Sequence, residues 1–237
     1  RSSGTAGDAA DTTTNGGTSA FSASTASAGI TVNPVNDSPA GLPTISGTPT
    51  EDQTLTAVTS GISDADGLGA FSYQWRRNGA NIVGSTGSTY TLGDSDVGAR
   101  ISVQVTYTDG QGSNESVISA QTTPVANVND VPVGVPLITG TVTEDQTLAA
   151  NTGGISDADG VATFNYQWLR DGANIAGGTG GTYTLGDLDV GARISVQVSY
   201  TDGQGTNESV TSAQTSPVAN VNDAPSGVPV ITGAATE

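Results

Sequence analysis

Short runs of alternating apolar and polar residues, separated by clusters of turn-forming residues, make up most of the chain. The clearest run is ARISVQVSY at 192–200, where an apolar side chain recurs at every second position. This period places the apolar side chains on one face of a β-strand. The 33 glycines, together with many Thr, Ser, Asn and Asp residues, favour short strands joined by turns. The pattern predicts an all-β fold.

A set of seven strands can be placed in the segment 129–221. One tryptophan, Trp168, falls on the third strand, and Trp75 holds the same place in the segment before it. Seven short strands in a segment of this size, with one buried tryptophan, are typical of an immunoglobulin-like β-sandwich. We therefore interpret both tryptophans as core anchors rather than ligand platforms. The expected strands are 135–140, 146–150, 164–168, 173–175, 182–185, 192–200 and 209–219.

The sequence repeats itself at an interval of 93 residues, as shown by Asn36-Asp37, Asn129-Asp130 and Asn222-Asp223. The first two copies align without a gap and are identical at 70 of 93 positions, so they must share one fold. We predict tandem immunoglobulin-like modules in an elongated array, cut from a longer protein. The expected parts are the end of a different β module at 1–35, repeat 1 at 36–128, repeat 2 at 129–221 and the first strand of a third repeat at 222–237.

The amino-acid composition limits which partners and which catalytic mechanisms are expected. The formal net charge is −17, with 23 acidic residues against six arginines. Such a charge repels nucleic-acid phosphates and anionic membranes and attracts divalent cations. The chain contains no His, Cys or Lys and no run of apolar residues long enough to span a bilayer. Catalysis would depend on carboxylates and hydroxyls alone, and the carboxylates fall on predicted turns, so we do not expect an enzyme.

The stretches YQWRRNGANIVGSTGSTYTLGDSDVGARISVQV and YQWLRDGANIAGGTGGTYTLGDLDVGARISVQV, each followed by YTDGQG, resemble the immunoglobulin-like extender repeats of large bacterial adhesins. Many of those are RTX adhesins exported by type I secretion. The resemblance covers residues 36–237. It implies an extracellular, cell-surface spacer that carries a distal binding domain for adhesion or biofilm formation. Host or biofilm glycans or proteins would then be bound by domains outside this chain.

The same repeats also have cadherin-like features. The linker NVNDVP, from Asn127 to Pro132, resembles the inter-domain calcium motif of cadherins, and Glu144 and Asp157-Ala-Asp159 resemble their later acidic motifs. The chain departs from that pattern at Asn127, where cadherins have an acidic residue, and at Pro34 in the earlier linker. The resemblance implies calcium ions at the junctions between modules.

Sandwich topology gives the acidic residues an expected meeting point. Calcium prefers six to eight oxygen ligands, which several loops must supply together. The loop with Asp157 and Asp159 and the turn with Asp202 are expected beside the linker residues Asn129 and Asp130, and Glu51 of the preceding module would complete the site. The same reasoning at the other junctions gives a full set of candidate ligands: Asn36, Asp37, Glu51, Asp64, Asp66, Asp109, Asn127, Asn129, Asp130, Glu144, Asp157, Asp159, Asp202, Asn222 and Asp223.

Other interpretations remain open. Asp-Gly and Asn-Asp-x-Pro are good turn formers without any ion. Asp96 and Asp189 are expected to be structural residues before the sixth strand, paired with Arg100 and Arg193. The modules themselves could bind carbohydrate or protein through their loops, or the chains could assemble into a filament by exchanging strands.

Overall fold

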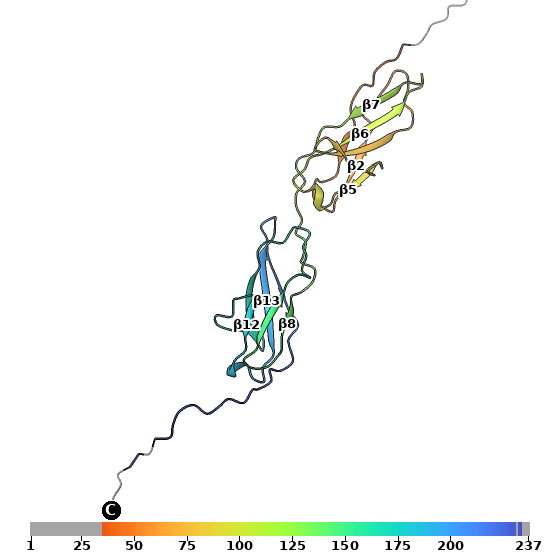
Figure 1. The fold of residues 1–237 in the computed structure, drawn as a ribbon. Coiled ribbons are helices and arrows are strands. Elements are labelled where there is room, and N and C mark those ends of the chain that lie inside the picture. Colours follow the sequence, from red (N-terminus) through yellow and green to blue (C-terminus); the bar gives the residue numbers. More distant parts are fainter. Residues whose placement is uncertain (1–34, 231, 234–237) are drawn as a thin grey trace, which may run out of the picture.

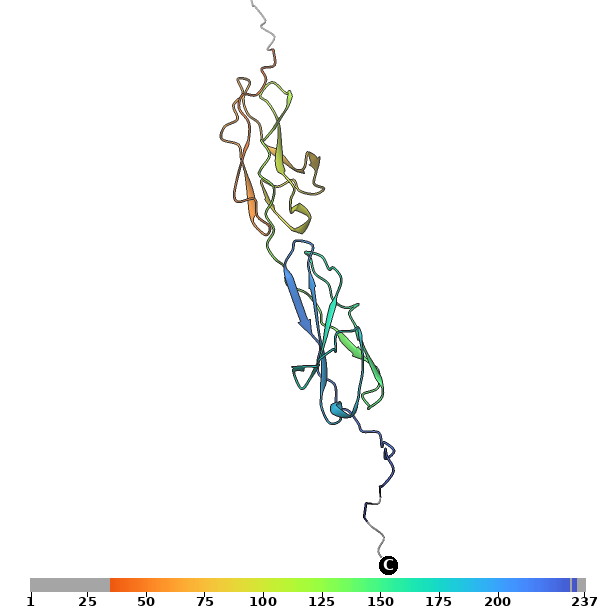
Figure 2. The same ribbon diagram turned by 90° about the vertical axis from the view of Figure 1, so that its left-hand side faces the viewer.

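The computed structural model describes residues 35–230, 232 and 233, and they form two β-sandwiches that lie end to end (Figures 1 and 2). We call residues 36–128 module 1 and residues 129–221 module 2. The module expected to end at residue 35 lies almost wholly outside the described residues. A single segment of the chain, the linker at 126–132, joins the two sandwiches.

Each sandwich pairs a three-stranded sheet with a four-stranded sheet, and all strand pairs are antiparallel. The three-stranded sheet of module 1 has the order β1-β2-β5 and the four-stranded sheet the order β4-β3-β6-β7. The elements are β1 Thr44–Ser46, β2 Thr54–Val58, β3 Ser72–Arg77, β4 Ala80–Asn81, β5 Thr89–Thr91, the 3₁₀ turn η1 Asp94–Asp96, β6 Ile101–Thr108 and β7 Asn114–Ile118.

Module 2 repeats this topology, with the orders β12-β9-β8 and β11-β10-β13-β14. The tandem immunoglobulin-like all-β fold predicted from the sequence is confirmed. Its elements are β8 Leu137–Thr139, β9 Thr147–Asn151, β10 Asn165–Arg170, β11 Ala173–Asn174, β12 Thr182–Thr184, the 3₁₀ turn η2 Asp187–Asp189, β13 Ile194–Thr201 and β14 Asn207–Thr211.

A separate apolar core fills each sandwich and is centred on its tryptophan. Trp75 and Trp168 are both fully buried. The Trp75 ring stacks on Tyr90 with centroids 5.7 Å apart, and its Nε1–H donates to the carbonyl of Gly87 (3.0 Å). Trp168 makes the same bond to Gly180 (2.8 Å). A buried indole N–H needs such an acceptor, so both tryptophans are the core anchors that the sequence predicts.

A tight hairpin joins β3 to β4, as its Asn-Gly sequence favours. Asn78 and Gly79 have φ values of 47° and 84°, the left-handed conformation that a two-residue type I′ turn requires. Asp171 and Gly172 adopt the same turn in module 2, with φ values of 48° and 86°. The turn also fixes the start of the sixth strand, because the Asn78 Oδ1 accepts from the Arg100 N–H (2.9 Å).

The last strand of each module is shorter than predicted. The expected strand at 209–219 is β14, which ends at Thr211. Beyond it, serine and threonine hydroxyls take the place of backbone acceptors: the Val196 N–H donates to Ser212 Oγ and the Ile194 N–H to Thr215 Oγ1, both at 3.0 Å. The regular ladder is therefore lost although the chain stays beside the sheet.

Two parallel β-bridges hold the segment through which the chain leaves each sandwich. Val125 forms a parallel bridge with Val97, and Ala126 forms one with Thr50. Val218 and Ala219 make the equivalent bridges in module 2. This segment therefore lies between the turn before β2 and the turn before β6, and the linker begins beside both.

Beyond module 2, no strand is assigned within 222–230 or at 232 and 233. The equivalent residues of module 2 form β8 by pairing with β9. The assignment of 222–237 to the first strand of a third repeat stays a prediction.

The core arrangement predicts a selective effect of the substitution Trp168→Ala. We expect it to destabilise module 2 by about 3–5 kcal/mol, because it leaves a cavity and removes the indole bond. Module 1 should be unaffected, and Trp75 fluorescence then reports its unfolding alone, while calorimetry follows module 2. Leu188→Ala, at a side chain that is 81% exposed, is the control and should change stability by less than about 0.5 kcal/mol. Equal loss in both modules would contradict independent cores.

Candidate metal centre

At the C-terminal end of module 1, the turn between β1 and β2 carries Glu51, which is only 1% exposed. Its backbone N–H donates to the carbonyl of Ala126 (2.9 Å), and its Oε2 accepts from the Val128 N–H (3.0 Å). Its other oxygen, Oε1, is buried and has no hydrogen-bond partner. A buried carboxylate oxygen without a partner is costly. Glu51 Oε1 is thus a position where a cation would supply the missing interaction.

The surroundings of Glu51 favour its neutral form. Burial raises the pKa of this carboxyl, and the Val128 N–H partly offsets that rise. The negative charges of the neighbouring Asp94 and Asp130 raise the pKa further. Burial and the neighbouring acids Asp94 and Asp159 likewise raise the pKa of Asp130. An added positive charge would reverse the electrostatic part of both shifts.

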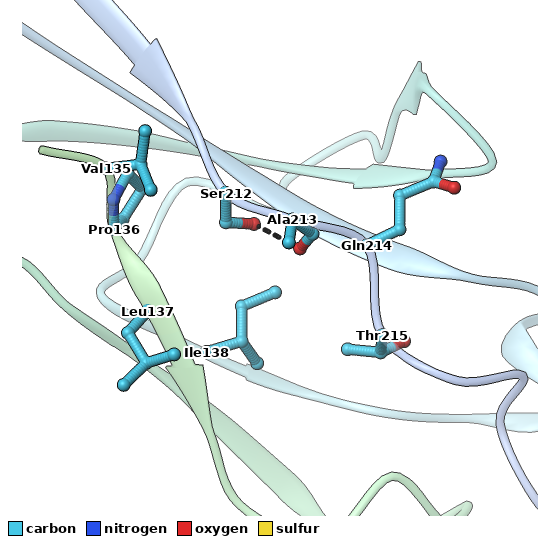
Figure 3. Close-up of a pocket in the computed structure, with 8 residues that line it drawn as sticks. All are labelled: Val135, Pro136, Leu137, Ile138, Ser212, Ala213, Gln214 and Thr215. Atoms are coloured by element: carbon cyan, nitrogen blue, oxygen red, sulfur yellow. Dashed lines mark hydrogen bonds between the residues drawn. The ribbon is translucent and has the colours of Figure 1, made fainter.

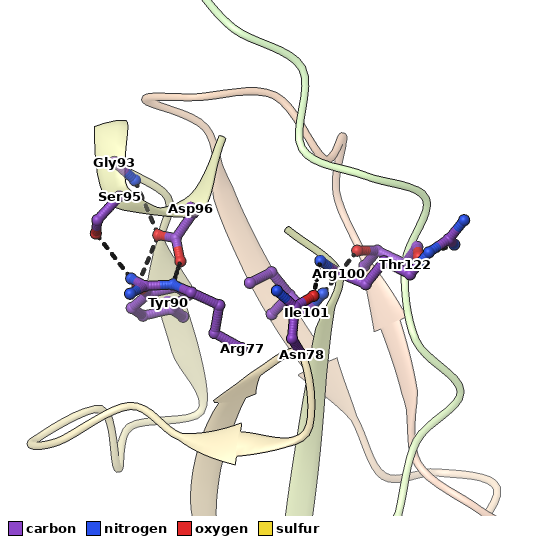
Figure 4. A network of polar contacts seen from close by, with 9 residues as sticks. All are labelled: Arg77, Asn78, Tyr90, Gly93, Ser95, Asp96, Arg100, Ile101 and Thr122. Atoms are coloured by element: carbon purple, nitrogen blue, oxygen red, sulfur yellow. Dashed lines mark hydrogen bonds and ion pairs between the residues drawn. The ribbon is translucent and has the colours of Figure 1, made fainter. Parts of the chain in front are cut away.

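Asp94 reaches this position on the 3₁₀ turn η1, which a buried network holds in place (Figure 4). Asp96, the last residue of η1, is 1% exposed and accepts from Arg77 Nε (2.6 Å), Tyr90 OH (2.7 Å) and the Gly93 N–H (3.1 Å). The Arg77 guanidinium also donates to Ser95 Oγ (2.8 Å). The carboxylate thus ties the turn to β3 and to the tyrosine that stacks on Trp75.

This network corrects the predicted pairing of Asp96 with Arg100. The Arg100 guanidinium instead donates to the carbonyl of Thr122 (3.0 Å). In module 2 the partner of Asp189 is Arg170 (2.7 Å), while Arg193 donates to the carbonyl of Thr215 (3.0 Å). The reason is strand direction, because β3 and β10 end beside the 3₁₀ turn. The structural role predicted for Asp96 and Asp189 holds.

The N-terminal end of module 2 presents the second half of the junction. The loop before β10 carries Asp157 and Asp159. The Asp159 Oδ2 accepts from the Asp130 N–H (2.8 Å), and the Asp157 Oδ1 accepts from the Asp159 N–H (2.9 Å). The Asp157 Oδ2 accepts from the Tyr200 hydroxyl. The linker is therefore fixed to this loop by its own backbone, and Asp159 is 8% exposed.

The turn between β13 and β14 packs against the same loop. Asp202 Oδ1 accepts from the Gln204 and Thr206 N–H groups (2.9 and 2.8 Å), while its buried Oδ2 has no partner. Burial acts to raise the pKa of Asp202, but the backbone hydrogen bonds outweigh it and lower the pKa. Gly203 allows the contact, since a Cβ there would lie 2.6 Å from the Asp159 carbonyl oxygen.

Three carboxylates from three segments meet where these parts join. One oxygen each of Glu51, Asp130 and Asp159 lies within 4.8 Å of the others. Glu51 belongs to module 1, Asp130 to the linker and Asp159 to module 2. Such a group of like charges can bind a hard cation.

A second group of three carboxylates lies at the C-terminal end of module 2. One oxygen each of Glu144, Asp187 and Asp223 falls within the same 4.8 Å limit. Glu144 is 2% exposed, and its Oε2 accepts from the Val221 N–H (3.0 Å). Glu144 thus repeats the contacts of Glu51, and Asp187 is the counterpart of Asp94.

The other predicted ligands take separate places. Asn129 donates to Glu208 Oε1 (2.9 Å), whereas the buried Oδ1 of Asn127 has no partner. Asn222 donates to the carbonyl of Asp223 (3.4 Å). Of the five side chains expected to converge at this junction, only Asp130 and Asp159 belong to the three-carboxylate group, because Asn129, Asp157 and Asp202 hold the ends of loops.

At the N-terminal end of module 1 the same loop contacts recur. Asp66 Oδ2 accepts from the Asp37 N–H (2.7 Å), Asp64 Oδ2 from Tyr107 OH (2.6 Å), and Asn36 donates to Glu115 (2.8 Å). Asp109 is buried and its Oδ2 has no partner. Within the described residues, no group of three carboxylates forms at this end.

Sequence reasoning missed Asp187 as a member of the second group and its counterpart Asp94 as a neighbour of Glu51. It also missed Glu115 and Glu208 as partners of the linker asparagines. The repeated GDxDVG motif carries the first pair. The first aspartate of the motif, Asp94 or Asp187, is exposed, and the second, Asp96 or Asp189, is buried. The first can therefore face the junction, whereas the second has a structural role.

An open groove runs along the edge of each sandwich. In module 2 it has a volume of about 280 Å³ (Figure 3). In module 1 the equivalent groove measures about 220 Å³ and is lined by Pro43, Thr44, Ile45, Ala120, Gln121 and Thr122. β1 and β8 are edge strands of their sheets, so one side of each lacks a neighbour. The lining residues in module 2 are Val135, Pro136, Leu137, Ile138, Ser212, Ala213, Gln214 and Thr215.

Comparison with known proteins assigns the chain to no family. No protein-family profile and no curated protein matches the chain. Among solved structures, the tandem Ig repeats of Dlar are 13% identical, and the match covers 77% of this chain and 97% of that one with a TM-score of 0.23. The immunoglobulin-like assignment therefore rests on sheet order and the two cores. The described part of the chain contains no helix with the length and hydrophobicity of a membrane span.

The environment of Glu51 predicts that Glu51→Gln stabilises module 1 in the presence of a chelator. Glutamine keeps an acceptor for the Val128 N–H and removes a buried charge that faces Asp94 and Asp130. We expect Tm at pH 7 to rise by about 4–8 °C, which corresponds to roughly 1 kcal/mol for a domain of this size. Because the folded-state pKa of Glu51 is raised, the native protein gains stability as the pH falls through that pKa. The difference in Tm between the native protein and Glu51→Gln should therefore vanish below that pKa.

Asp52→Asn is the matched control. It removes the same charge at the neighbouring, exposed position, where asparagine tolerates the φ of 60°. Its Tm should stay near that of the native protein, and an equal rise in both variants would show that net charge, rather than burial, is responsible.

Proposed function

We propose that the chain is a stretch of the extender region of a secreted bacterial surface adhesin, in which calcium ions rigidify the junctions between immunoglobulin-like modules. The observation that carries this proposal is the meeting of Glu51, Asp130 and Asp159, one from each side of the junction and one from the linker, within 4.8 Å. An ion held by all three would join two sandwiches that otherwise share only a linker.

The donor set favours calcium over transition metals. Only oxygen ligands are available, because the chain contains neither His nor Cys. Carboxylates, amide oxygens and backbone carbonyls are the ligands of calcium, whose flexible coordination suits segments of different origin. Glu51, Asp130 and Asp159 would hold the ion, and Asp94 lies beside them. The buried, unpartnered Oε1 of Glu51 supports a bound cation at this place.

A cation changes the mechanics of the array. Without it, the acidic ends of the two modules face each other and repel, and the linker allows them to swing apart. With it, the same carboxylates attract a shared positive charge, and the rotations at the linker are lost. A chain of such junctions would behave as a rod that carries a distal binding domain away from the cell surface.

The position of this rod in an adhesin is supported by sequence features. Two neighbouring modules identical at 70 of 93 positions provide length rather than diversity, and the resemblance to adhesin extender repeats points the same way. In this proposal the location is the bacterial cell surface and the partners are calcium and neighbouring modules. Catalysis has no part in it.

The edge grooves favour a second candidate, assembly of chains into a filament by strand addition. The unpaired side of β8 and the apolar lining beside it suit an added β-strand. Loop-mediated binding of carbohydrate or protein has less support, because none of the aromatic side chains in the described residues is exposed. Light scattering would distinguish the two roles, since a filament gains mass with concentration and a spacer does not.

Small-angle scattering in millimolar calcium and then in chelator tests the proposed spacer. We expect the native chain to become longer and stiffer in calcium, and Asp159→Asn to lose most of this response. Asp66→Asn is the matched control, because it makes the same change in the same loop of module 1, away from this junction. A native chain that responds to calcium in neither shape nor Tm would rule out calcium as the brace and favour strand addition.

A further inference from the structure

The tip of the β3–β4 hairpin combines two features that make an asparagine chemically labile. Within the described residues, Asn78 is the only asparagine that a glycine follows in the chain. Asn78 and Gly79 are both exposed, and a Cβ on Gly79 would meet nothing within 4 Å. The Gly79 N–H donates no hydrogen bond within the described part of the chain. A backbone nitrogen without a neighbouring Cβ is thus free beside a side-chain amide.

We infer that Asn78 is a site of spontaneous deamidation, a covalent modification of module 1 that needs no enzyme. The Gly79 nitrogen attacks the Cγ atom of Asn78 and loses its proton, and the new N–C bond closes a succinimide ring. The side-chain amide nitrogen takes up that proton and leaves as ammonia. Water then opens the ring at one of its two carbonyls, which gives either aspartate or isoaspartate. The reaction does not depend on the proposed calcium site.

Hydrogen bonds to β6 restrain the reacting amide in the closed turn. The Asn78 N–H donates to the Arg100 carbonyl (2.8 Å), and the Asn78 Oδ1 accepts from the Arg100 N–H (2.9 Å; Figure 4). Because these bonds hold the side chain on the backbone of Arg100, ring closure needs the turn to open first.

Opening of this hairpin leaves the rest of the sandwich in place. β4 is an edge strand of only two residues, and its one partner is β3. The two registered pairs are Arg76 with Asn81 and Arg77 with Ala80. Short, exposed edge segments open at a small fraction of the free energy of global unfolding. The reaction therefore proceeds in the folded chain.

Module 2 shows that the fold accepts one of the two products. Its residue at the same place is already an aspartate, Asp171, which has a φ of 48°. The Asp171 N–H donates to the Arg193 carbonyl (2.8 Å), and the Asp171 Oδ1 accepts from the Arg193 N–H (2.9 Å). An aspartate at position 78 can thus close the same turn with the same two bonds.

Isoaspartate does not fit this turn. It carries the main chain through the side-chain carbon and so lengthens a loop of two residues by a methylene group. The type I′ geometry fixes the register of the two strands that the turn joins. A chain with isoaspartate at position 78 therefore loses the pairing of β4, whereas a chain with aspartate keeps it.

Mass spectrometry of the aged chain tests the inference. The folded chain is kept in a mildly alkaline buffer, then unfolded and cut after arginine. The peptide 78–100 should gain the mass difference between an amide and an acid. The peptide 171–193 is the internal control and should keep its mass, because Asp171 replaces the reactive asparagine and Asn174, like Asn81, precedes an isoleucine. The other Asn-Gly pair, at 15–16, lies outside the described residues and in a different peptide.

A sample aged in urea gives the rate without the fold. We expect deamidation of the folded chain to be slower by no more than about tenfold, since exposed edge segments open easily. If the peptide 78–100 keeps its amide in the folded chain and loses it in urea, the inference is overturned.

The variant Leu55→Ala separates opening of the hairpin from unfolding of the module. Leu55 is fully buried in β2, which belongs to the other sheet. Its loss should raise the unfolded population of module 1 by roughly a hundredfold, and circular dichroism establishes that the aged variant is folded. The deamidation rate should equal that of the native chain. A rate that rises with the unfolded population would overturn reaction in the folded chain.

Asn78→Asp tests which product the fold accepts. We expect the same Tm as the native chain and the same hydrogen-exchange protection of the Arg100 N–H, because Asp171 makes the equivalent bonds. Asn78→Ala removes the side-chain acceptor and is the comparison in which this protection should fall. An equal loss of protection in Asn78→Asp would contradict aspartate as the product that the turn accepts.

Discussion

Glu51 and Glu144 hold a negative charge inside the protein at the point where the chain leaves each sandwich. One oxygen of each carboxylate accepts a linker N–H, so the direction of the linker is tied to the module. Because the linker direction is fixed, Asp130 is presented to the loop of the next module, where Asp159 receives its N–H. The arrangement of the junction therefore depends on a buried charge whose second oxygen is left without a donor.

This constraint gives the array a polarity. The C-terminal end of a module contributes a rigid pair of acids on two bonded turns, whereas the N-terminal end contributes a loop whose acids mainly hold one another and the linker backbone. Asp157 is occupied by Tyr200, and Asp202 closes its own turn. The two ends are both acidic but have different roles: the C-terminal end directs the linker through a buried glutamate, and the N-terminal end binds the linker backbone through an acidic loop.

The strands and cores could be predicted because they depend on local alternation. Ile194, Val196 and Val198 are fully buried as the pattern in 192–200 indicates. The approach of Glu51 to the next linker also followed from sandwich topology. The pairing of Asp96 could not be predicted from proximity in the sequence, because Arg100 is only four residues away and yet donates to Thr122, whereas Arg77 reaches Asp96 from the end of β3. The position of Asp94 depends on the same contact between β3 and η1.

The arginines have a consequence for proteolysis. Within the described residues they lie in β3 and β10 or directly before β6 and β13, and the linker at 126–132 contains neither Arg nor Lys. A protease that cuts after basic residues therefore finds no site in this linker. Cleavage after Arg77 or Arg170 requires its strand to leave the sheet, at a rate that depends on the opening free energy of the sandwich. Digestion by such a protease would consequently measure the opening of single modules, whatever the angle between them.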